Sequence, residues 1–256
     1  MNDNSQESLV TQQFGPRAAA YVTSATHSQG QDLARLKAMF EGSAEVRILD
    51  LGCGGGHASF AAAGSVREVV AYDLSQDMLD AVAAEATRRG LGNIRVERGA
   101  VEHLPFADAS FDAVITRFSA HHWGDLGAAL REARRVVKPT GRAAFIDAVS
   151  PGTPLLDTFI QAIELIRDPS HVRDYAVAEW CAQLAAAGFG ITAVTPRRVP
   201  IAFGPWIERM RTPTIQADAI RALQGRMSAA VVAHFAIAAD GSFELDAAMI
   251  EAVPTR

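Results

Sequence analysis

A carboxylate stands beside a run of glycines near residue 50. The apolar run Val46–Leu51 is typical of a strand that is buried on both faces, and the glycine-rich turn Gly52–Gly56 follows it directly. Glycine lets the backbone turn sharply and come close to a ligand, so such a turn suits a nucleotide-like molecule. A pyrophosphate would be bound by backbone N–H groups and repelled by an acid. Asp50 therefore favours a ligand that carries a cationic group.

A second acid ends the next apolar run. Glu68–Asp73 is typical of a strand that finishes on an acid, about 20 residues after the glycine turn, where dinucleotide-binding folds place the acid that binds ribose hydroxyls. Either acid alone would indicate only an ordinary strand-to-helix turn, because such acids are common helix caps. Together, Asp50 and Asp73 predict a ligand with both an ammonium group and a ribose, and S-adenosylmethionine has both.

Two adjacent histidines follow the fourth apolar run of the chain. The segment Arg117–Trp123 contains His121 and His122, and an imidazole titrates near enough to neutral pH to take a proton from an attacking nucleophile. Two interpretations stay open. Either His122 or His121 is a catalytic base, or one of them is a structural residue that packs with Trp123.

These segments resemble the class I S-adenosylmethionine-dependent methyltransferases, in particular the branch similar to the quinone-biosynthesis C-methyltransferases (methyltransferase type 11). Further segments match in order: Gly99–Phe106 is similar to the adenine-contact loop, Ser110–Thr116 to the fourth strand, and Leu130–Gly141 to the helix and turn before the fifth strand. The resemblance spans residues 44–150.

The resemblance implies a set of residues that bind the cofactor S-adenosylmethionine. Two positions depart from the family pattern: Ala100 stands where relatives often carry an Asp near the adenine amino group, and Thr140 replaces a usual Gly. Backbone groups at Ala100 and Val101 are expected to substitute for the missing carboxylate. The implied cofactor residues are Asp50, Gly52, Cys53, Gly54, Asp73, Leu74, Ala100, Val101, Glu102, Arg117 and Phe118.

Apolar runs alternate with helical patterns along the chain, as a doubly wound sheet requires. With the resemblance, they predict an α/β fold: a seven-stranded Rossmann-like sheet, mostly parallel with one antiparallel strand, and helices on both faces. Helices are expected from Ser75 to Gly90, over Asp125–Val137 with a stop near Pro139, and over Glu179–Ala187. The expected strands are Val46–Leu51, Glu68–Asp73, Ile94–Glu97, Phe111–Thr116, Arg142–Val149, Ile191–Val199 and Phe243–Val253.

The stretches outside this core are expected to form the acceptor side of the site, because ligands of open α/β sheets bind beyond the carboxyl ends of the strands. Tyr21 and His27 are candidate polar groups there, and Tyr21 is also a candidate catalytic residue. Aliphatic residues at helical spacing in these stretches favour packing over ligand contact. We expect one domain over residues 1–256, with an N-terminal cap (1–40), a cofactor-binding core (44–150), substrate-side caps (151–175 and 204–230) and the last strands within 191–253.

Composition narrows the class of partner. A net charge of −5 gives no electrostatic footprint for nucleic acid, and the Asn/Asp-Pro-Pro-aromatic motif of amino-group nucleic-acid methyltransferases is missing. The polar start Met1–Glu7 is unlike a signal peptide, and no apolar run is long enough to predict a membrane span, so a cytoplasmic protein is expected. Two cysteines predict reduced thiols rather than a disulfide framework or a metal site.

The predicted function is methyl transfer from S-adenosylmethionine to a small-molecule acceptor that is apolar or aromatic, without a metal, by a monomer or homodimer. The nucleophile would displace S-adenosylhomocysteine in line. Two alternatives stay open: a non-catalytic S-adenosylmethionine-binding protein that interacts with a partner, and a nicotinamide-dependent oxidoreductase, which Asp50 disfavours.

Overall fold

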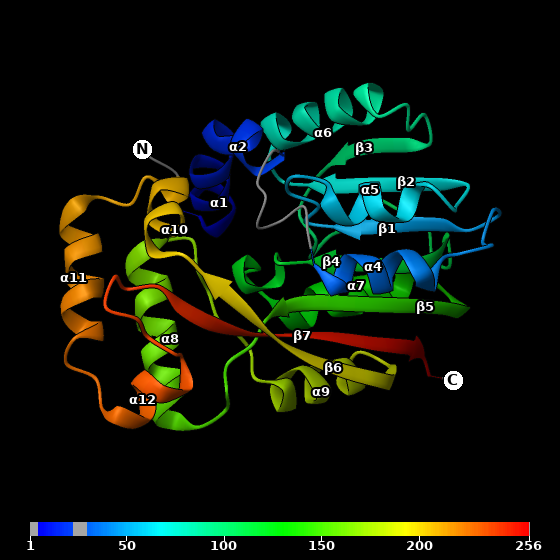
Figure 1. Ribbon diagram of the computed structural model, residues 1–256. Coiled ribbons are helices and arrows are strands. Elements are labelled where there is room, and N and C mark those ends of the chain that lie inside the picture. The colour runs from blue at the N-terminus through cyan, green and yellow to red at the C-terminus, as the bar shows by residue number, and fades with distance from the viewer. Residues whose placement is uncertain (1–4, 23–29, 256) are drawn as a thin grey trace.

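The centre of the molecule is a sheet whose strands lie in the order β3-β2-β1-β4-β5-β7-β6 (Figure 1). The computed structural model describes residues 5–22 and 30–255. Within them β1 to β5 pair in parallel, whereas β7 runs antiparallel to both of its neighbours. The predicted fold class is confirmed. The strands are β1 (Arg47–Leu51), β2 (Glu68–Asp73), β3 (Ile94–Arg98), β4 (Phe111–Arg117), β5 (Val137–Ala148), β6 (Phe189–Ile201) and β7 (Phe243–Pro254).

Helices connect the strands and extend beyond them. Two helix starts follow from side-chain caps: Ser75 accepts a hydrogen bond from the backbone N–H of Met78, and Asp125 accepts one from Ala128. The helices are α1 (Gln6–Phe14), η1 (Gly15–Arg17), α2 (Ala18–Val22), α4 (Gln31–Met39), α5 (His57–Ala63), α6 (Gln76–Arg88), η2 (Ala120–His122), α7 (Leu126–Val136), α8 (Pro154–Arg167), α9 (Val177–Ala186), α10 (Phe203–Met210), α11 (Thr214–Gln224) and α12 (Ala229–His234).

Both faces of the parallel part of the sheet are covered, which explains the continuous apolar runs. In β1 the side chains alternate between the two faces. Ile48 packs in the layer of α4 and α5, while Leu49 and Leu51 pack in the layer of α7 and α9. Helix α6 covers β2 and the edge strand β3 on the same face as α5, and its Leu79 packs with Ala71 of β2.

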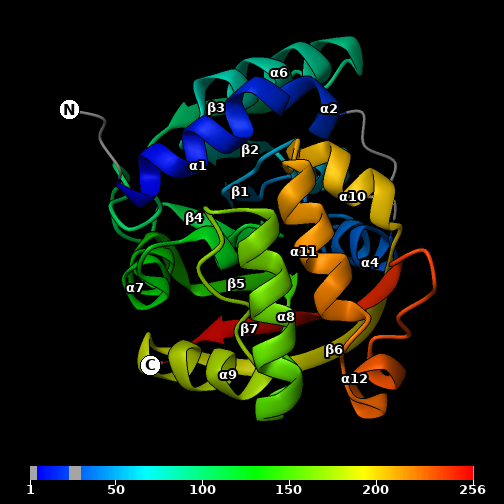
Figure 2. The same ribbon diagram turned by 90° about the vertical axis from the view of Figure 1, so that its left-hand side faces the viewer.

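The remaining helices gather at the carboxyl ends of the parallel strands, as Figures 1 and 2 show for α1, α2, α8, α10 and α11. Helix α8 packs with α11 and α12 around a separate apolar cluster that includes Phe159 and Phe235. No helix in the described part of the chain is long and apolar enough to cross a membrane. The layout therefore encloses the strand ends that carry Asp50 and Asp73.

Several element boundaries differ from the sequence prediction: β6, for example, spans Phe189–Ile201 rather than Ile191–Val199, and the largest difference is at the start of β5. Strand β5 begins at Val137 rather than Arg142 and contains Pro139, because the register passes from Phe111 opposite Val137 to Ala113 opposite Arg142 and leaves the residues between as a bulge. A proline is tolerated there because the bulge needs no ladder N–H. The N-terminal cap expected over residues 1–40 contains helix α1, which no separate signal in the sequence predicted. His27, a candidate polar group of the N-terminal cap, lies outside the described residues.

Candidate active site

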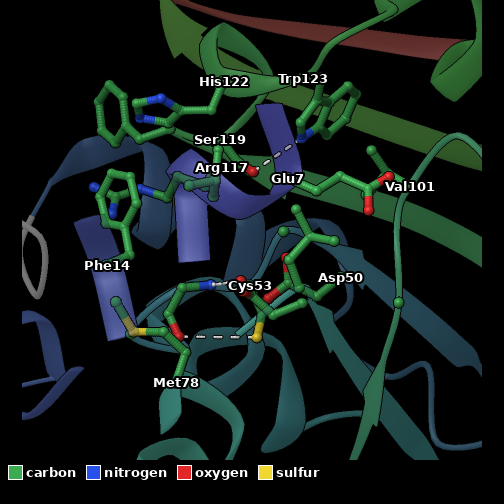
Figure 3. A pocket seen from close by; sticks show the side chains of 18 of the residues that line it. Glu7, Phe14, Asp50, Cys53, Met78, Val101, Arg117, Ser119, His122 and Trp123 are labelled. Atoms are coloured by element: carbon green, nitrogen blue, oxygen red, sulfur yellow. Dashed lines mark hydrogen bonds between the residues drawn. The ribbon is translucent and has the colours of Figure 1, made fainter. Parts of the chain in front are cut away.

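A cavity of about 280 Å³ lies between α1 and the carboxyl ends of β1, β2 and β4. Figure 3 shows His122 and Trp123 on one side of it, and Asp50, Cys53 and Met78 on the opposite side. Ala100 and His121 are the predicted site residues that do not line it. The predicted residues that do are Tyr21, Asp50, Gly52, Cys53, Gly54, Asp73, Leu74, Val101, Glu102, Arg117, Phe118 and His122.

The glycine turn after β1 uses its glycines for two different purposes. Gly52 and Gly54 have φ of +63° and +49°, in the left-handed region that favours glycine. A Cβ at Gly52 would lie 1.8 Å from Oγ of Ser119, so the turn packs against the loop after β4. A Cβ at Gly54 would meet nothing within 4 Å. Gly54 therefore leaves open space in the cavity for another molecule.

Asp50 at the end of β1 has one occupied and one available carboxylate oxygen. Its Oδ2 accepts a hydrogen bond of 2.6 Å from the Ser59 hydroxyl, while no described residue donates to its buried Oδ1. Burial raises the pKa of Asp50 to about 7, and the nearby Asp73 carboxylate adds to the rise. A cation in the cavity would satisfy Oδ1 and favour the ionised form.

Asp73 at the end of β2 holds the glycine turn. Its Oδ2 accepts from the backbone N–H of Gly54 at 2.8 Å and its Oδ1 from that of Ser75 at 2.9 Å. Burial raises its pKa. A carboxylate has about four acceptor positions, so two further hydroxyl groups can donate to Asp73 without displacing these bonds. The thiol of Cys53, in the same turn, stays protonated because burial raises its pKa well above the usual range.

Arg117 at the end of β4 belongs to a buried ion triad. Its Nε lies 2.5 Å from Oδ2 of Asp32 on α4, and Arg197 on β6 pairs with the other oxygen of Asp32. The Phe118 ring contacts both guanidinium groups, with its centroid 4.8 Å from that of Arg117 and 5.6 Å from that of Arg197. The triad places a fixed positive charge in the cavity wall near Asp50.

The side of the cavity that was predicted to hold adenine is formed by Leu74, Val101 and Glu102. Oε1 of Glu102 accepts from the backbone N–H groups of Gly124 at 3.1 Å and Asp125 at 3.4 Å, so this side chain already joins the loop to the start of α7. Ala100 lies outside the cavity lining.

The two adjacent histidines have pKa values shifted in opposite directions. His121 contacts Asp147 through Nδ1 at 2.6 Å, and His122 contacts the Ser170 carbonyl through Nδ1 at 3.1 Å. Burial lowers the pKa of His121, but the Asp147 carboxylate outweighs this and the pKa rises to about 9. Burial and the charge on His121 lower the pKa of His122 to about 4. At neutral pH His122 is the uncharged imidazole in the cavity wall.

Helix α1 covers the cavity with Glu7, Val10 and Phe14, which the sequence analysis missed. The Phe14 ring lies 4.8 Å from the His122 ring, edge to face. Gln6 donates to the carbonyl oxygens of His122 and Ser170. The helix has no buried residue, so its sequence lacks the apolar stripe that would have revealed it.

Tyr21 on α2 contacts the site through its backbone and its ring. Its carbonyl oxygen accepts from Nε2 of His57 at 2.9 Å, and a Cβ at Gly55 would lie 2.9 Å from that carbonyl. Its hydroxyl donates to Sδ of Met210 at 3.1 Å. Burial raises the pKa of Tyr21. The phenol is therefore a neutral part of the cavity wall that connects α2 to α10.

Comparisons with known proteins single out this region. A family model described as "Methyltransferase domain" matches residues 49–145, which include the glycine turn, Asp73 and both histidines. The chain is 47% identical over 197 residues to the uncharacterized protein YafE of Escherichia coli (strain K12), covering 77% of this chain and 95% of that protein.

Two further relatives are described as methyltransferases. The chain is 36% identical over 200 residues to the uncharacterized methyltransferase YcgJ of Bacillus subtilis (strain 168), covering 78% of this chain and 79% of that protein. The crystal structure of YcgJ matches with a TM-score of 0.84 and 32% identity over 88% of this chain and 99% of that one. The 2-phytyl-1,4-naphtoquinone methyltransferase of Synechococcus elongatus is 38% identical over 120 residues, 45% of this chain and 51% of that protein.

Proposed function

The chain belongs to the class I S-adenosylmethionine-dependent methyltransferases, and we propose that it methylates a small apolar or aromatic acceptor that binds in the cavity beneath α1. The observation that carries the cofactor part of this proposal is Oδ1 of Asp50. It is a buried carboxylate oxygen in the cavity wall without a donor among the described residues. An ammonium group supplies the donor that this oxygen lacks.

The rest of the cavity fits the same cofactor. Arg117 lies in the wall near Asp50, so opposite charges are available for the ammonium and carboxylate groups of an amino acid. The remaining acceptor positions of Asp73 suit two ribose hydroxyls, and the open space at Gly54 allows close approach of a ligand. Leu74 and Val101 offer apolar contacts to a base.

The cofactor, when bound, supplies a methyl group on a sulfonium that a nucleophile can displace. The protein would contribute orientation and the exclusion of water, which in favourable systems reach about 7–11 kcal/mol of rate enhancement. The cofactor would be held by Asp50, Asp73 and Arg117. Helix α1 shields the cavity from solvent. No side chain needs to form a covalent bond with either partner.

The acceptor side supports an apolar or aromatic molecule. Val10, Phe14, Tyr21 and Phe118 line the cavity, and aromatic walls favour flat rings through edge and face contacts. The name of the Synechococcus relative refers to a naphthoquinone, which is such a molecule. Neutral His122 offers the acceptor a polar contact, although a base with a pKa of about 4 is too weak for a carbon acid of low acidity.

The test is an assay for S-adenosylhomocysteine. The purified protein is incubated with S-adenosylmethionine and a panel of quinols, phenols and apolar acids, and mass spectrometry detects both products. We expect turnover with a flat hydroxylated acceptor, and none in a Gly54→Val control. Binding of S-adenosylhomocysteine without turnover on any acceptor would favour the non-catalytic alternative. Thermal stabilisation by NAD but not by S-adenosylmethionine would overturn the proposal.

A further inference from the structure

Behind His122 the protein buries an unusual concentration of polar side chains. They come from the end of β5 and from the loop between α8 and α9, and none of them lines the cavity. Burial of so many ionisable groups is costly unless their hydrogen bonds and charges are arranged to compensate. The group consists of Asp147, Asp168, Ser170, His171 and Asp174.

Asp147 holds His121 at two points. Its Oδ1 contacts Nδ1 of the His121 ring at 2.6 Å, and its Oδ2 accepts from the His121 backbone N–H at 3.2 Å. Oδ1 also accepts from the backbone N–H of Ala148 at 2.8 Å. Asp147 is 3% exposed, so these bonds are protected from water. The end of β5 therefore fixes both the ring and the backbone of His121.

His121 in turn holds the loop that contacts His122. Its carbonyl oxygen accepts from the backbone N–H of Val172 at 2.8 Å and of Arg173 at 3.3 Å. These bonds position the nearby carbonyl of Ser170 at 3.1 Å from Nδ1 of His122. A carbonyl oxygen only accepts, so Nδ1 of His122 carries a hydrogen.

The Ser170 hydroxyl also requires the hydrogen of the His122 ring to be on Nδ1. It donates its hydrogen to Oδ1 of Asp168 at 2.7 Å, so it faces Nδ1 of His122 at 3.4 Å as an acceptor as well. The neutral His122 ring then has its lone pair on Nε2. None of the hydrogen bonds found among the described residues uses that nitrogen.

The charges around the two rings favour a proton on His121 and not a second one on His122. The ring centroids are 4.2 Å apart, close enough for one imidazolium to oppose another. His171 stays neutral, because burial and the charge on His121 lower its pKa to about 3. The charged or titratable groups that face the pair are Asp147 from β5, Glu164 and Arg167 from α8, Asp168, His171 and Asp174 from the following loop, and Glu7 from α1 on the cavity side.

We propose that His121 and Asp147 are positioning residues that keep the His122 ring uncharged with its hydrogen on Nδ1, so that Nε2 is a hydrogen-bond acceptor for the substrate. This deepens the proposed function and rests on it for the identity of the cavity. The acceptor molecule is then one that presents a proton donor, such as a phenolic or enolic hydroxyl, to Nε2. Methylation at that oxygen forms the O–CH₃ bond as the bond from sulfur to methyl breaks. Nε2 of His122 accepts the hydrogen bond of the attacking hydroxyl, and the released proton passes to water because His122, with a pKa of about 4, does not retain it.

The test reads the ring nitrogens directly by long-range ¹H–¹⁵N NMR on the full chain. In the wild type we expect His122 as the Nδ1–H tautomer at neutral pH, and His121 with protons on both nitrogens. Titration should protonate His122 only below about pH 5. A wild-type His122 that carries its hydrogen on Nε2 would overturn the proposal without any variant.

Two substitutions test whether the His121–Asp147 pair keeps His122 uncharged. His121→Gln removes the imidazolium and keeps Asp147, so we expect the titration midpoint of His122 to rise by about 1 pH unit or more. Asp147→Asn should raise it less, because a negative charge is lost at the same time. The matched control is Asp246→Asn, which breaks another imidazole–carboxylate contact of 2.6 Å, to His234, and should leave His122 unchanged.

The positioning role of His121 and Asp147 and the proposed function would be contradicted by different results. An unchanged His122 midpoint in folded His121→Gln would overturn the positioning role, and this variant decides the question if Asp147→Asn does not fold. Calorimetry with S-adenosylhomocysteine tests the cofactor site independently, since neither His121 nor Asp147 lines the cavity. Wild-type protein that shows the expected tautomer but binds no S-adenosylhomocysteine would contradict the proposed function instead.

Discussion

Asp50 combines burial with an available oxygen, and its protonation should control the affinity for a cation. Its pKa is raised to about 7 by burial, so the carboxylate is only partly ionised at neutral pH. The ionised form is the one that attracts an ammonium group. We expect the affinity for S-adenosylhomocysteine to rise from pH 6 to pH 8 and then level off, measured by calorimetry.

The Asp50→Asn variant provides the control. It keeps the size of the side chain but cannot ionise, so the pH dependence should disappear and binding should weaken by about 1.5–3 kcal/mol. 5′-Methylthioadenosine lacks the amino-acid part of the cofactor and should bind wild type and Asp50→Asn equally. Equal losses for both ligands would show that the substitution damages the turn, and that Asp50 does not contact the ammonium group.

Gly54 is expected to be required for the ligand and not for the fold. Gly54→Val adds a side chain where nothing lies within 4 Å, so it should fill cofactor space and abolish S-adenosylhomocysteine binding. Gly90→Val is the matched control, because Gly90 also has a positive φ and open space but lies after α6, away from the cavity lining. Both variants should lose similar stability in urea. Retained affinity in folded Gly54→Val would place the ligand elsewhere.

At the scale of elements, α1 covers the cavity without contributing to the core. Besides the ring contact of Phe14 with His122, it is held by polar contacts, such as those of Gln6 with Ser170 and of Gln13 with Asp168. Deletion of residues 1–14 should therefore leave the melting temperature within a few degrees of wild type. It should speed the release of S-adenosylhomocysteine and eliminate methyl transfer, because water enters the acceptor side.

Stopped-flow measurement of S-adenosylhomocysteine release and the product assay check this prediction. Gln6→Ala is the milder variant, since it removes two hydrogen bonds of α1 and keeps the apolar contact of Phe14 with His122. Its release rate should fall between those of wild type and the deletion. Undiminished turnover by the deleted protein would show that α1 does not close the acceptor side.

The sequence predicted elements well where one local signal determined them. Strand β2 matches its expected bounds, and Ser75 caps α6 as expected, because alternation of apolar runs and side-chain caps are local effects. The start of β5 was wrong, since Pro139 is accommodated by a bulge that only the pairing with β4 explains. Helix α1 was missed because polar contacts with distant loops stabilise it.

At the scale of the whole molecule, the ion triad of Arg117, Asp32 and Arg197 joins β4, α4 and β6. Burial raises the pKa of Asp32, but the two guanidinium groups outweigh this, so the folded-state pKa is lowered. Its contribution to stability is therefore present above its unfolded-state pKa and is lost as the pH falls through the folded-state value.

Removal of the central carboxylate should be costly. Asp32→Asn leaves two guanidinium charges close together in a buried setting, and we expect a loss of about 3–5 kcal/mol in the free energy of unfolding by urea at pH 7. Asp246→Asn breaks a more exposed pair with Arg198 and should cost less than about 1 kcal/mol. Comparable losses in the two variants would show that the buried triad contributes no more to stability than the more exposed ion pair.

The sequence predicted the cofactor side of the candidate site but not the surroundings of the two histidines. Asp50 and Asp73 end successive strands, so their proximity follows from the parallel order of β1 and β2. Asp147 and Ser170 gave no such signal, because they meet the His121–His122 pair through sheet order and loop geometry rather than through a repeated spacing. Sequence patterns therefore reported the cofactor side and left the environment of the histidines to the structure.

The position of β7 has a consequence for biosynthesis. It follows every other strand in the chain, yet it lies between β5 and β6 and pairs with both. While a ribosome is still adding residues 243–254, the nascent sheet exposes an unpaired edge on β5, and β6 has no partner. Such edges can pair with other nascent chains, so this interval is when the polypeptide is most prone to aggregation and most dependent on chaperones.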